Sequence, residues 1–219
     1  MRILIVAATP IEVAPVVAGL RALSGRGPRL TRYAHAAHDV DVLITGVGMV
    51  ATAAWCSHVL ALSRYDLALN VGVCGSFDPD LKPGDVVQVV TDCLAELGAE
   101  DGEAFVSIHE LNLPAEDEFR NVAPPANAAL GRLPAVRGIT VNTVHGNERS
   151  IAAMTMRCRP QVESMEGAAF MQSCLIHEIE FAQVRAVSNV VERRNRDAWK
   201  LAEAIGALGV VALSILEHQ

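Results

Sequence analysis

The sequence predicts an α/β protein, a single three-layer α/β/α domain built around a mixed, largely parallel central sheet. Three observations lead to this fold class. Aliphatic and β-branched runs such as residues 3–8 and 67–73 have no alternating polar positions, which is typical of strands buried on both faces. Segments with helical spacing follow these runs along the chain. Aromatic residues make up only 4% of the 219 residues, which suits helices packed on a sheet better than a β-sandwich.

The elements can be placed in order along the chain. Strands are expected at residues 3–8, 40–45, 67–73, 85–90, 105–108, 139–144 and 179–187. Helices are expected at 11–23, 50–62, 127–133, from 150, at 167–177 and at 197–216. Residues 95–126 are rich in Glu, Asp and Pro, and we interpret them as an insertion. No linker or repeat divides the chain, so one domain is expected over residues 1–219.

Charge and hydropathy exclude two classes of partner. The net charge is −7, and the longest basic cluster, Arg193, Arg194 and Arg196, is flanked by Glu192 and Asp197. This pattern does not suit nucleic-acid binding. The apolar run at the start of the chain ends within residues 9–12, so it predicts a strand and not a signal peptide. The apolar stretch 204–216 is shorter than the ~20 residues of a membrane span.

Cysteine and histidine spacing indicates no metal centre. Five cysteines (Cys56, Cys74, Cys93, Cys158 and Cys174) lack C-x-x-C spacing, which predicts reduced thiols, mostly core fillers, in a cytoplasmic protein. No pair of histidines has H-x-x-x-H spacing. Gly46-Val47-Gly48 resembles part of a dinucleotide-binding motif, but Ala51 takes the place of its third glycine. Neither a metal nor a cofactor is therefore expected.

Three charged residues stand at the positions where an open α/β sheet binds ligands. Glu12 follows the first strand, Glu166 precedes an Ala-rich helix, and Arg185 lies inside an apolar strand. The carboxylates have an ordinary alternative interpretation, because acidic residues are favoured in the first turn of a helix. A charge inside a buried strand must find a partner or reach a site, which makes Arg185 the more informative residue.

Six segments in this order carry a family resemblance: AATPIE (7–12), TGVG (45–48), NVGVCGS (70–76), LKPGDVV (81–87), VESMEGAA (162–169) and VRAVSN (184–189). Together they resemble the nucleoside phosphorylase/hydrolase family that includes methylthioadenosine/S-adenosylhomocysteine nucleosidase. The resemblance spans almost the whole chain. It implies cleavage of the bond between a purine and ribose, and a homo-oligomer, with a dimer suggested.

The resemblance also implies roles for individual residues. Glu12 would be the general base that activates water, and Arg185 would hold it. Glu166 would accept hydrogen bonds from the 2′- and 3′-hydroxyls, while Met165 packs on the ribose. Carboxylates near the anomeric carbon suit this chemistry, because the transition state resembles an oxocarbenium cation. The remaining substrate contacts implied are backbone groups of Cys74 and Gly75, together with Ser188 and His145.

One departure from the family indicates the substrate. Adenine-cleaving members have an aspartic acid where this chain has Asn189. An amide transfers no proton, but it can accept N7–H and donate to an oxygen at position 6, as in hypoxanthine or guanine. Residues 190–200 and 141–146 resemble the branch of the family that acts in the menaquinone pathway and hydrolyses futalosine to hypoxanthine and dehypoxanthine futalosine. Its benzoate arm suits an arginine clamp at 193–196, whose alternative interpretation is an exposed turn with Asp197 capping the last helix.

Three alternatives remain open from the sequence. An adenine-specific nucleosidase is opposed mainly by Asn189. A phosphate-dependent phosphorylase needs arginines around the anion, and residues 3–20 contain none. A binding protein without activity is opposed by the presence of Glu12, Glu166 and Arg185 together.

Overall fold

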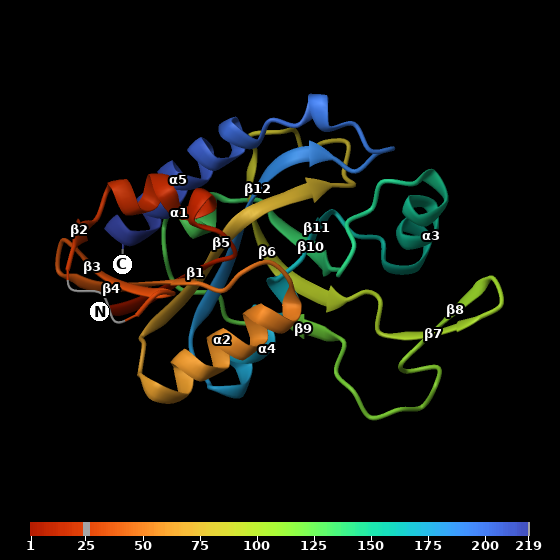
Figure 1. The fold of residues 1–219 in the computed structure, drawn as a ribbon, viewed down its shortest axis with the longest axis horizontal. Coiled ribbons are helices and arrows are strands. Elements are labelled where there is room, and N and C mark those ends of the chain that lie inside the picture. The colour runs from red at the N-terminus through yellow and green to blue at the C-terminus, as the bar shows by residue number, and fades with distance from the viewer. Residues whose placement is uncertain (24–26, 219) are drawn as a thin grey trace.

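The computed structural model describes residues 1–23 and 27–218 (Figure 1). Its strands are β1 (Arg2–Ala7), β2 (Arg21–Ala22), β3 (Leu30–His35), β4 (His38–Ile44), β5 (Leu67–Ser76), β6 (Val86–Leu94), β7 (Gly98–Asp101), β8 (Ala104–Ser107), β9 (Glu118–Arg120), β10 (Ala135–Thr140), β11 (Val162–Ser164) and β12 (Phe181–Val190). The α-helices are α1 (Pro10–Ala18), α2 (Met49–Leu62), α3 (Glu148–Cys158), α4 (Gly167–Ile176) and α5 (Leu201–Glu217). Two short 3-10 helices span Leu130–Arg132 and Arg196–Ala198.

The predicted three-layer architecture is confirmed. Helices α1 and α5 cover one face of the sheet, and α2 and α4 cover the other (Figure 1). Strand β1 shows why its sequence has no polar alternation. Leu4 and Val6 point into the core beneath α2 and α4, while Ile3 and Ile5 point into the core beneath α1 and α5. A strand covered on both faces needs apolar side chains at every position.

The central sheet has ten strands in the order β11-β10-β6-β12-β5-β1-β4-β3-β2, with β9 paired to β6. Parallel pairing joins β4, β1, β5 and β12, whereas β12 meets β6 in antiparallel orientation. Strand β11 pairs with β10 and also with the end of β5, so that Glu163 lies opposite Gly75. Strands β5, β12, β6, β10 and β11 thus form a closed ring at one end of the sheet.

Two predicted helices are shorter than expected. The helix predicted for 11–23 ends at Ala18, because Gly19 caps it and the chain turns into β2, which pairs with β3. Strand β3 was not predicted from the sequence; it lies next to the edge strand β2, and all its residues are only partly buried. The helix predicted for 127–133 is a single 3-10 turn. There the side chain of Asn127 accepts from the backbone N–H groups of Ala129 and Leu130, which holds a turn in place of a helix.

Other boundaries also differ. The last helix begins at Leu201 with Lys200 as its N-cap, so Asp197 does not cap it; Asp197 lies in a separate 3-10 helix. The strand predicted for 139–144 is β10, which lies four residues earlier at both ends. Residues 95–126, interpreted as an insertion, contain the β7–β8 hairpin and β9. Among the described residues, no helix combines the length and apolar character that a membrane span requires.

The start of α4 depends on a close approach between backbone and buried polar side chains. Asp92 accepts hydrogen bonds from Gln183 Nε2 (2.9 Å) and Thr140 Oγ1 (3.0 Å), and Thr140 in turn accepts from the backbone N–H of Ala168 (2.7 Å). Burial raises the pKa of Asp92 to about 6, although these hydrogen bonds oppose the increase. A Cβ at Gly167 would lie 2.1 Å from Asp92 Oδ2, so this position has no room for a side chain.

Gly167→Ala is therefore expected to lower the free energy of unfolding by about 1–3 kcal/mol, because the methyl group would displace Asp92 and Gln183. Gly206→Ala is the matched control: Gly206 lies on α5, and nothing lies within 4 Å of an added Cβ. The control should raise stability by about 0.5–1 kcal/mol through helix propensity. Denaturant unfolding of both variants checks this, and equal stability of the two would contradict the packing described.

Candidate active site

The carboxyl end of β1 and the neighbouring strands β5 and β12 bring together the charged residues predicted from the sequence. Glu12 lies in the first turn of α1, directly after β1. Arg185 lies on β12 opposite Gly72 of β5, and Asn70 lies two residues before Gly72. Glu166 is the N-cap residue of α4. The strands are parallel, so their functional side chains meet on one side of the sheet.

The carboxylate of Glu12 accepts hydrogen bonds from three donors, and only 8% of the residue is exposed. Its Oε2 accepts hydrogen bonds from Thr9 N (2.9 Å) and Thr9 Oγ1 (2.8 Å), which forms a capping box at the start of α1. Its Oε1 accepts from the backbone N–H of Val73 at 3.2 Å. The helix-capping and functional interpretations of Glu12 are therefore compatible, because the cap orients the carboxylate toward β5.

Arg185 is a fully buried cation with only 1% of its surface exposed. Its Nη2 donates to Asn70 Oδ1 at 2.5 Å, and its Nη1 lies 4.0 Å from Glu166 Oε2. A Cβ at Gly72 would lie 2.1 Å from Arg185 Nη1 and 3.0 Å from Glu12 Oε1. The guanidinium therefore lies beside both carboxylates, but Asn70 accepts its short hydrogen bond.

Glu166 is 5% exposed, and its Oε1 accepts a hydrogen bond from the backbone N–H of Gly48 at 3.0 Å. Burial raises the pKa of Glu166, the charge of Arg185 opposes this, and the charge of Glu12 adds to it. Met165 directly precedes Glu166 in the turn between β11 and α4 and is partly exposed. The structure thus places two buried carboxylates around one buried guanidinium.

A second cluster forms where β12 leaves its regular register, with a bulge between Val187 and Asn189. Ser188 Oγ lies 3.1 Å from the carbonyl of Cys74 and 2.8 Å from Asn189 Oδ1. Asn189 Nδ2 donates to the carbonyl of Val190 at 3.0 Å. This last contact fixes the orientation of the Asn189 amide, because a flipped amide would place its oxygen against the carbonyl oxygen of Val190. Asn189 Nδ2 also lies 3.3 Å from a Cβ built at Gly75.

His145 joins the same end of the sheet through Glu163, which the sequence analysis did not single out. His145 Nδ1 lies 2.6 Å from Glu163 Oε2, and the backbone N–H of His145 donates to the same carboxylate. Both side chains are buried. Phe77 lies edge-on to the imidazole, with 5.9 Å between ring centroids. Because Glu163 is opposite Gly75, His145 is linked to the cluster of Ser188 and Asn189.

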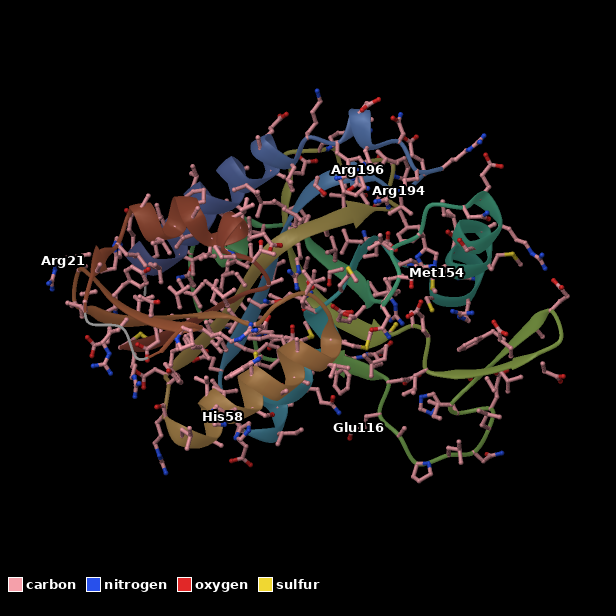
Figure 2. The ribbon with its side chains drawn as sticks, in the orientation of Figure 1. Arg21, His58, Glu116, Met154, Arg194 and Arg196 are labelled. Carbon is pink, nitrogen blue, oxygen red and sulfur yellow. The ribbon has the colours of Figure 1, made fainter. Side chains whose placement is uncertain are left out.

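Two loops that resemble the futalosine-cleaving branch are in contact. The backbone N–H of Arg194 donates to the carbonyl of Gly146 at 3.2 Å. The guanidinium groups of Arg194 and Arg196 lie over the Trp199 ring, at 5.5 and 5.9 Å from its centroid. Figure 2 shows both arginines near the end of β12. Both arginines are exposed, and stacking on Trp199 limits their conformational freedom.

A cavity of about 1000 Å³ adjoins this region between α3 and the β7–β8 hairpin. His145, Arg149, Arg157 and Glu100 are among its lining residues. Its lining does not include the residues around Arg185, so the cavity lies beside the carboxylate cluster and not within it. His145 lines this cavity and also contacts Glu163.

The sequence analysis missed Asn70 and Glu163. Asn70 had a detectable signal, because it is a polar residue in an otherwise apolar strand, as Arg185 is. Glu163 had none: its contact with His145 spans eighteen residues and depends on the pairing of β11 with β5.

A family model described as the phosphorylase superfamily matches residues 2–217. The chain belongs to this superfamily. A futalosine hydrolase of Streptomyces coelicolor is 30% identical, covering 95% of this chain and 92% of the relative. A futalosine hydrolase of Thermus thermophilus is 29% identical over 81% of each chain. A 5′-methylthioadenosine/S-adenosylhomocysteine nucleosidase of Tolumonas auensis is 27% identical, covering 87% of this chain and 86% of the relative.

Solved structures of superfamily members share the fold. A Helicobacter pylori 5′-methylthioadenosine/S-adenosylhomocysteine nucleosidase superposes with a TM-score of 0.86 at 13% identity, covering 100% of this chain and 99% of that one. The native futalosine hydrolase of Helicobacter pylori strain 26695 gives a TM-score of 0.79 at 13% identity, covering 100% and 98%.

The environment of Glu166 predicts its titration. Burial should hold its pKa above the ordinary glutamate value of about 4.3. Arg185→Met should raise this pKa further, because it removes the neighbouring positive charge, whereas Arg185→Lys should have a smaller effect. Carbon-13 NMR of glutamate-labelled protein, with Glu166→Gln to assign the signal, measures the shift. A Glu166 pKa at or below the ordinary value in the unmodified protein would contradict the described surroundings.

Proposed function

We propose that this protein hydrolyses the N-glycosidic bond of futalosine, giving hypoxanthine and dehypoxanthine futalosine, in menaquinone biosynthesis by the futalosine pathway. The observation that carries the proposal is the fixed amide of Asn189 beside Ser188 and Gly75. An amide in this position accepts from N7–H and donates to O6 of hypoxanthine. The futalosine hydrolase of Streptomyces coelicolor, similar over 95% of this chain, supports the same substrate.

At the sugar, Glu12 acts as the general base and Glu166 binds the ribose diol. Water approaches the anomeric carbon beside Glu12, whose carboxylate the Thr9 and Val73 donors hold in one orientation. Both carboxylates stabilise the positive charge that develops as the base departs. Arg185 balances their charge in the ground state, and Met165 packs against the ribose.

At the base, Cys74 and Gly75 contribute backbone groups, and Ser188 orients the Asn189 amide. His145, held by Glu163 and flanked by Phe77, bounds the site on the side of the cavity. The loop of Arg194 and Arg196 contacts Gly146 and binds the benzoate arm of the substrate.

Water, and not phosphate, is the second substrate in this proposal. Residues 3–20 contain no arginine that could bind an anion. Arg29 lies beside the loop that follows β4, and its Nη1 donates to the backbone carbonyls of Ile44 and Thr45. Its guanidinium lies 5.1 Å above the Trp55 ring. On the basis of the family resemblance, the protein acts in the cytoplasm as a homodimer and uses no metal or cofactor.

Glu12→Gln keeps the size and most hydrogen bonds of the side chain but removes its basicity. The chemical step should fall by roughly 100-fold or more, while substrate still binds. Single-turnover kinetics with futalosine, together with equilibrium binding to the variant, separates these effects. Turnover close to that of the unmodified protein would exclude Glu12 as the base.

Paired kinetics on futalosine and methylthioadenosine test the role of Asn189. The unmodified protein should cleave futalosine and leave methylthioadenosine essentially intact, because adenine presents a donor where the amide needs an acceptor. Asn189→Asp should weaken futalosine cleavage, since an ionised carboxylate repels O6. Chromatography of the released base, with and without phosphate, gives the readout. Efficient methylthioadenosine cleavage by the unmodified protein would overturn the substrate assignment, and a sugar 1-phosphate product would overturn hydrolysis.

A further inference from the structure

Two cysteines far apart in the sequence meet outside the candidate active site. Cys93 is the penultimate residue of β6, and Cys158 is the last residue of α3. Cys158 packs against the apolar cluster that contains Cys93, and both cysteines line a cavity of about 570 Å³. Cys93 is 7% exposed, whereas Cys158 is only partly buried and can be reached from the cavity. The core-filler role expected from the sequence does not explain this pairing.

Two arginines place positive charge beside this thiol pair. Arg157, the residue before Cys158, lines the same cavity, and its Nη2 donates to the carbonyl of Ala95 at 2.8 Å and lies 3.8 Å from Met154 Sδ. Arg137 of β10 lines the same cavity. One of its amino groups pairs with Glu118, but its buried Nε has no hydrogen-bond partner within the described part of the chain.

The surroundings favour ionisation of one thiol of the pair. The hydrogen bond from Cys93, supported by Arg157 and Arg137 and opposed by burial, lowers the pKa of Cys158 below the ordinary cysteine value. The same hydrogen bond and burial raise the pKa of Cys93, and the charge of Asp92 adds to this. Cys158 is therefore the more acidic thiol of the pair, and Cys93 remains the proton-bearing donor.

The acidic groups that line the cavity have partners of their own, so they do not cancel the positive charge of Arg157 and Arg137 beside Cys158. Glu118 is neutralised by Arg120 and Arg137, at 2.6 Å each. Asp117 pairs with His109 at 2.7 Å toward the exposed end of the cavity. Glu110, also in the lining, accepts hydrogen bonds from Ser107.

We propose that Cys158 and Cys93 form a thiol modification site, in which Cys158 reacts with a hydroperoxide and Cys93 resolves the product to a disulfide. The Cys158 thiolate attacks the terminal peroxide oxygen, the O–O bond breaks, and the leaving alkoxide takes a proton to become an alcohol. Cys158 is then a sulfenic acid, oxidised by two electrons. The Cys93 thiol displaces its hydroxyl group as water and forms the S–S bond.

The disulfide would act on α3. This helix has a single buried residue, Met154, so noncovalent packing holds it weakly. It stands apart from the two helix layers (Figures 1 and 2). Its first turn follows His145 by three residues. A covalent bond from its last residue to β6 would therefore restrain the helix that forms one wall of the larger cavity.

Oxidation of the full-length protein by one equivalent of tert-butyl hydroperoxide tests this proposal. Intact-mass spectrometry should show the loss of two hydrogens, reversed by dithiothreitol, and nonreducing peptide mapping should find Cys93 linked to Cys158. Hydrogen exchange across residues 148–158 should slow in the oxidised protein. A linkage between other cysteines, sulfinic acid without a disulfide, or unchanged exchange would overturn it.

Variants assign the two roles. Cys93→Ser should stop the reaction at a sulfenic acid that dimedone traps, and Cys158→Ser should abolish it. Cys174→Ser is the matched control, because Cys174 is fully buried on α4, and it should react as the unmodified protein does. Iodoacetamide labelling against pH gives a readout that needs no variant. Cys158 should label first, with the midpoint of its pH dependence below the ordinary cysteine pKa of about 8.5; labelling no faster than that of the other cysteines would contradict its role.

Discussion

The candidate site depends on one buried positive charge. Arg185 lies in the middle of a strand that is otherwise apolar, and without compensation its burial would cost several kcal/mol. Asn70 binds it directly, while Glu12 and Glu166 supply negative charge on the side of Gly72. The carboxylates and Asn70 lower the free-energy cost of burying the guanidinium, and the guanidinium in turn offsets the cost of burying acidic side chains beside it. The absence of a side chain at Gly72 is what allows this close arrangement.

The ring of strands closed by β11 links this charge cluster to the rest of the site. Pairing of β11 with β5 places Glu163 opposite Gly75, and Glu163 holds His145. The loop that carries His145 in turn contacts Arg194. The buried carboxylates, the Asn189 amide and the arginine loop therefore share one framework, in which backbone pairing sets the relative positions.

The sequence was sufficient to predict the three-layer architecture and the charged residues of the candidate site. Burial on both faces leaves a continuous apolar run, and a charge within such a run, as at Arg185, is conspicuous. Contacts that depend on ring closure leave no local pattern, so Glu163 with His145 and Cys93 with Cys158 could be found only in three dimensions. The missed strand β3 lies next to the edge strand β2 and is only partly buried, so its apolar signal is weaker. The helix predicted at 127–133 was wrong because Asn127 is a residue type that commonly begins helices. Here its side chain caps a turn that leads only into a short 3-10 helix.

The bulge in β12 divides the strand into two parts with different surroundings. Before it, Arg185 sits in a regular ladder whose register the core enforces on both faces. Beyond it, Asn189 no longer follows that register, and its neighbours are polar or partly exposed. A substitution on the far side of the bulge can thus alter the surroundings of Asn189 without disturbing the buried charges around Arg185. This separation allows the two halves of the strand to vary independently in sequence.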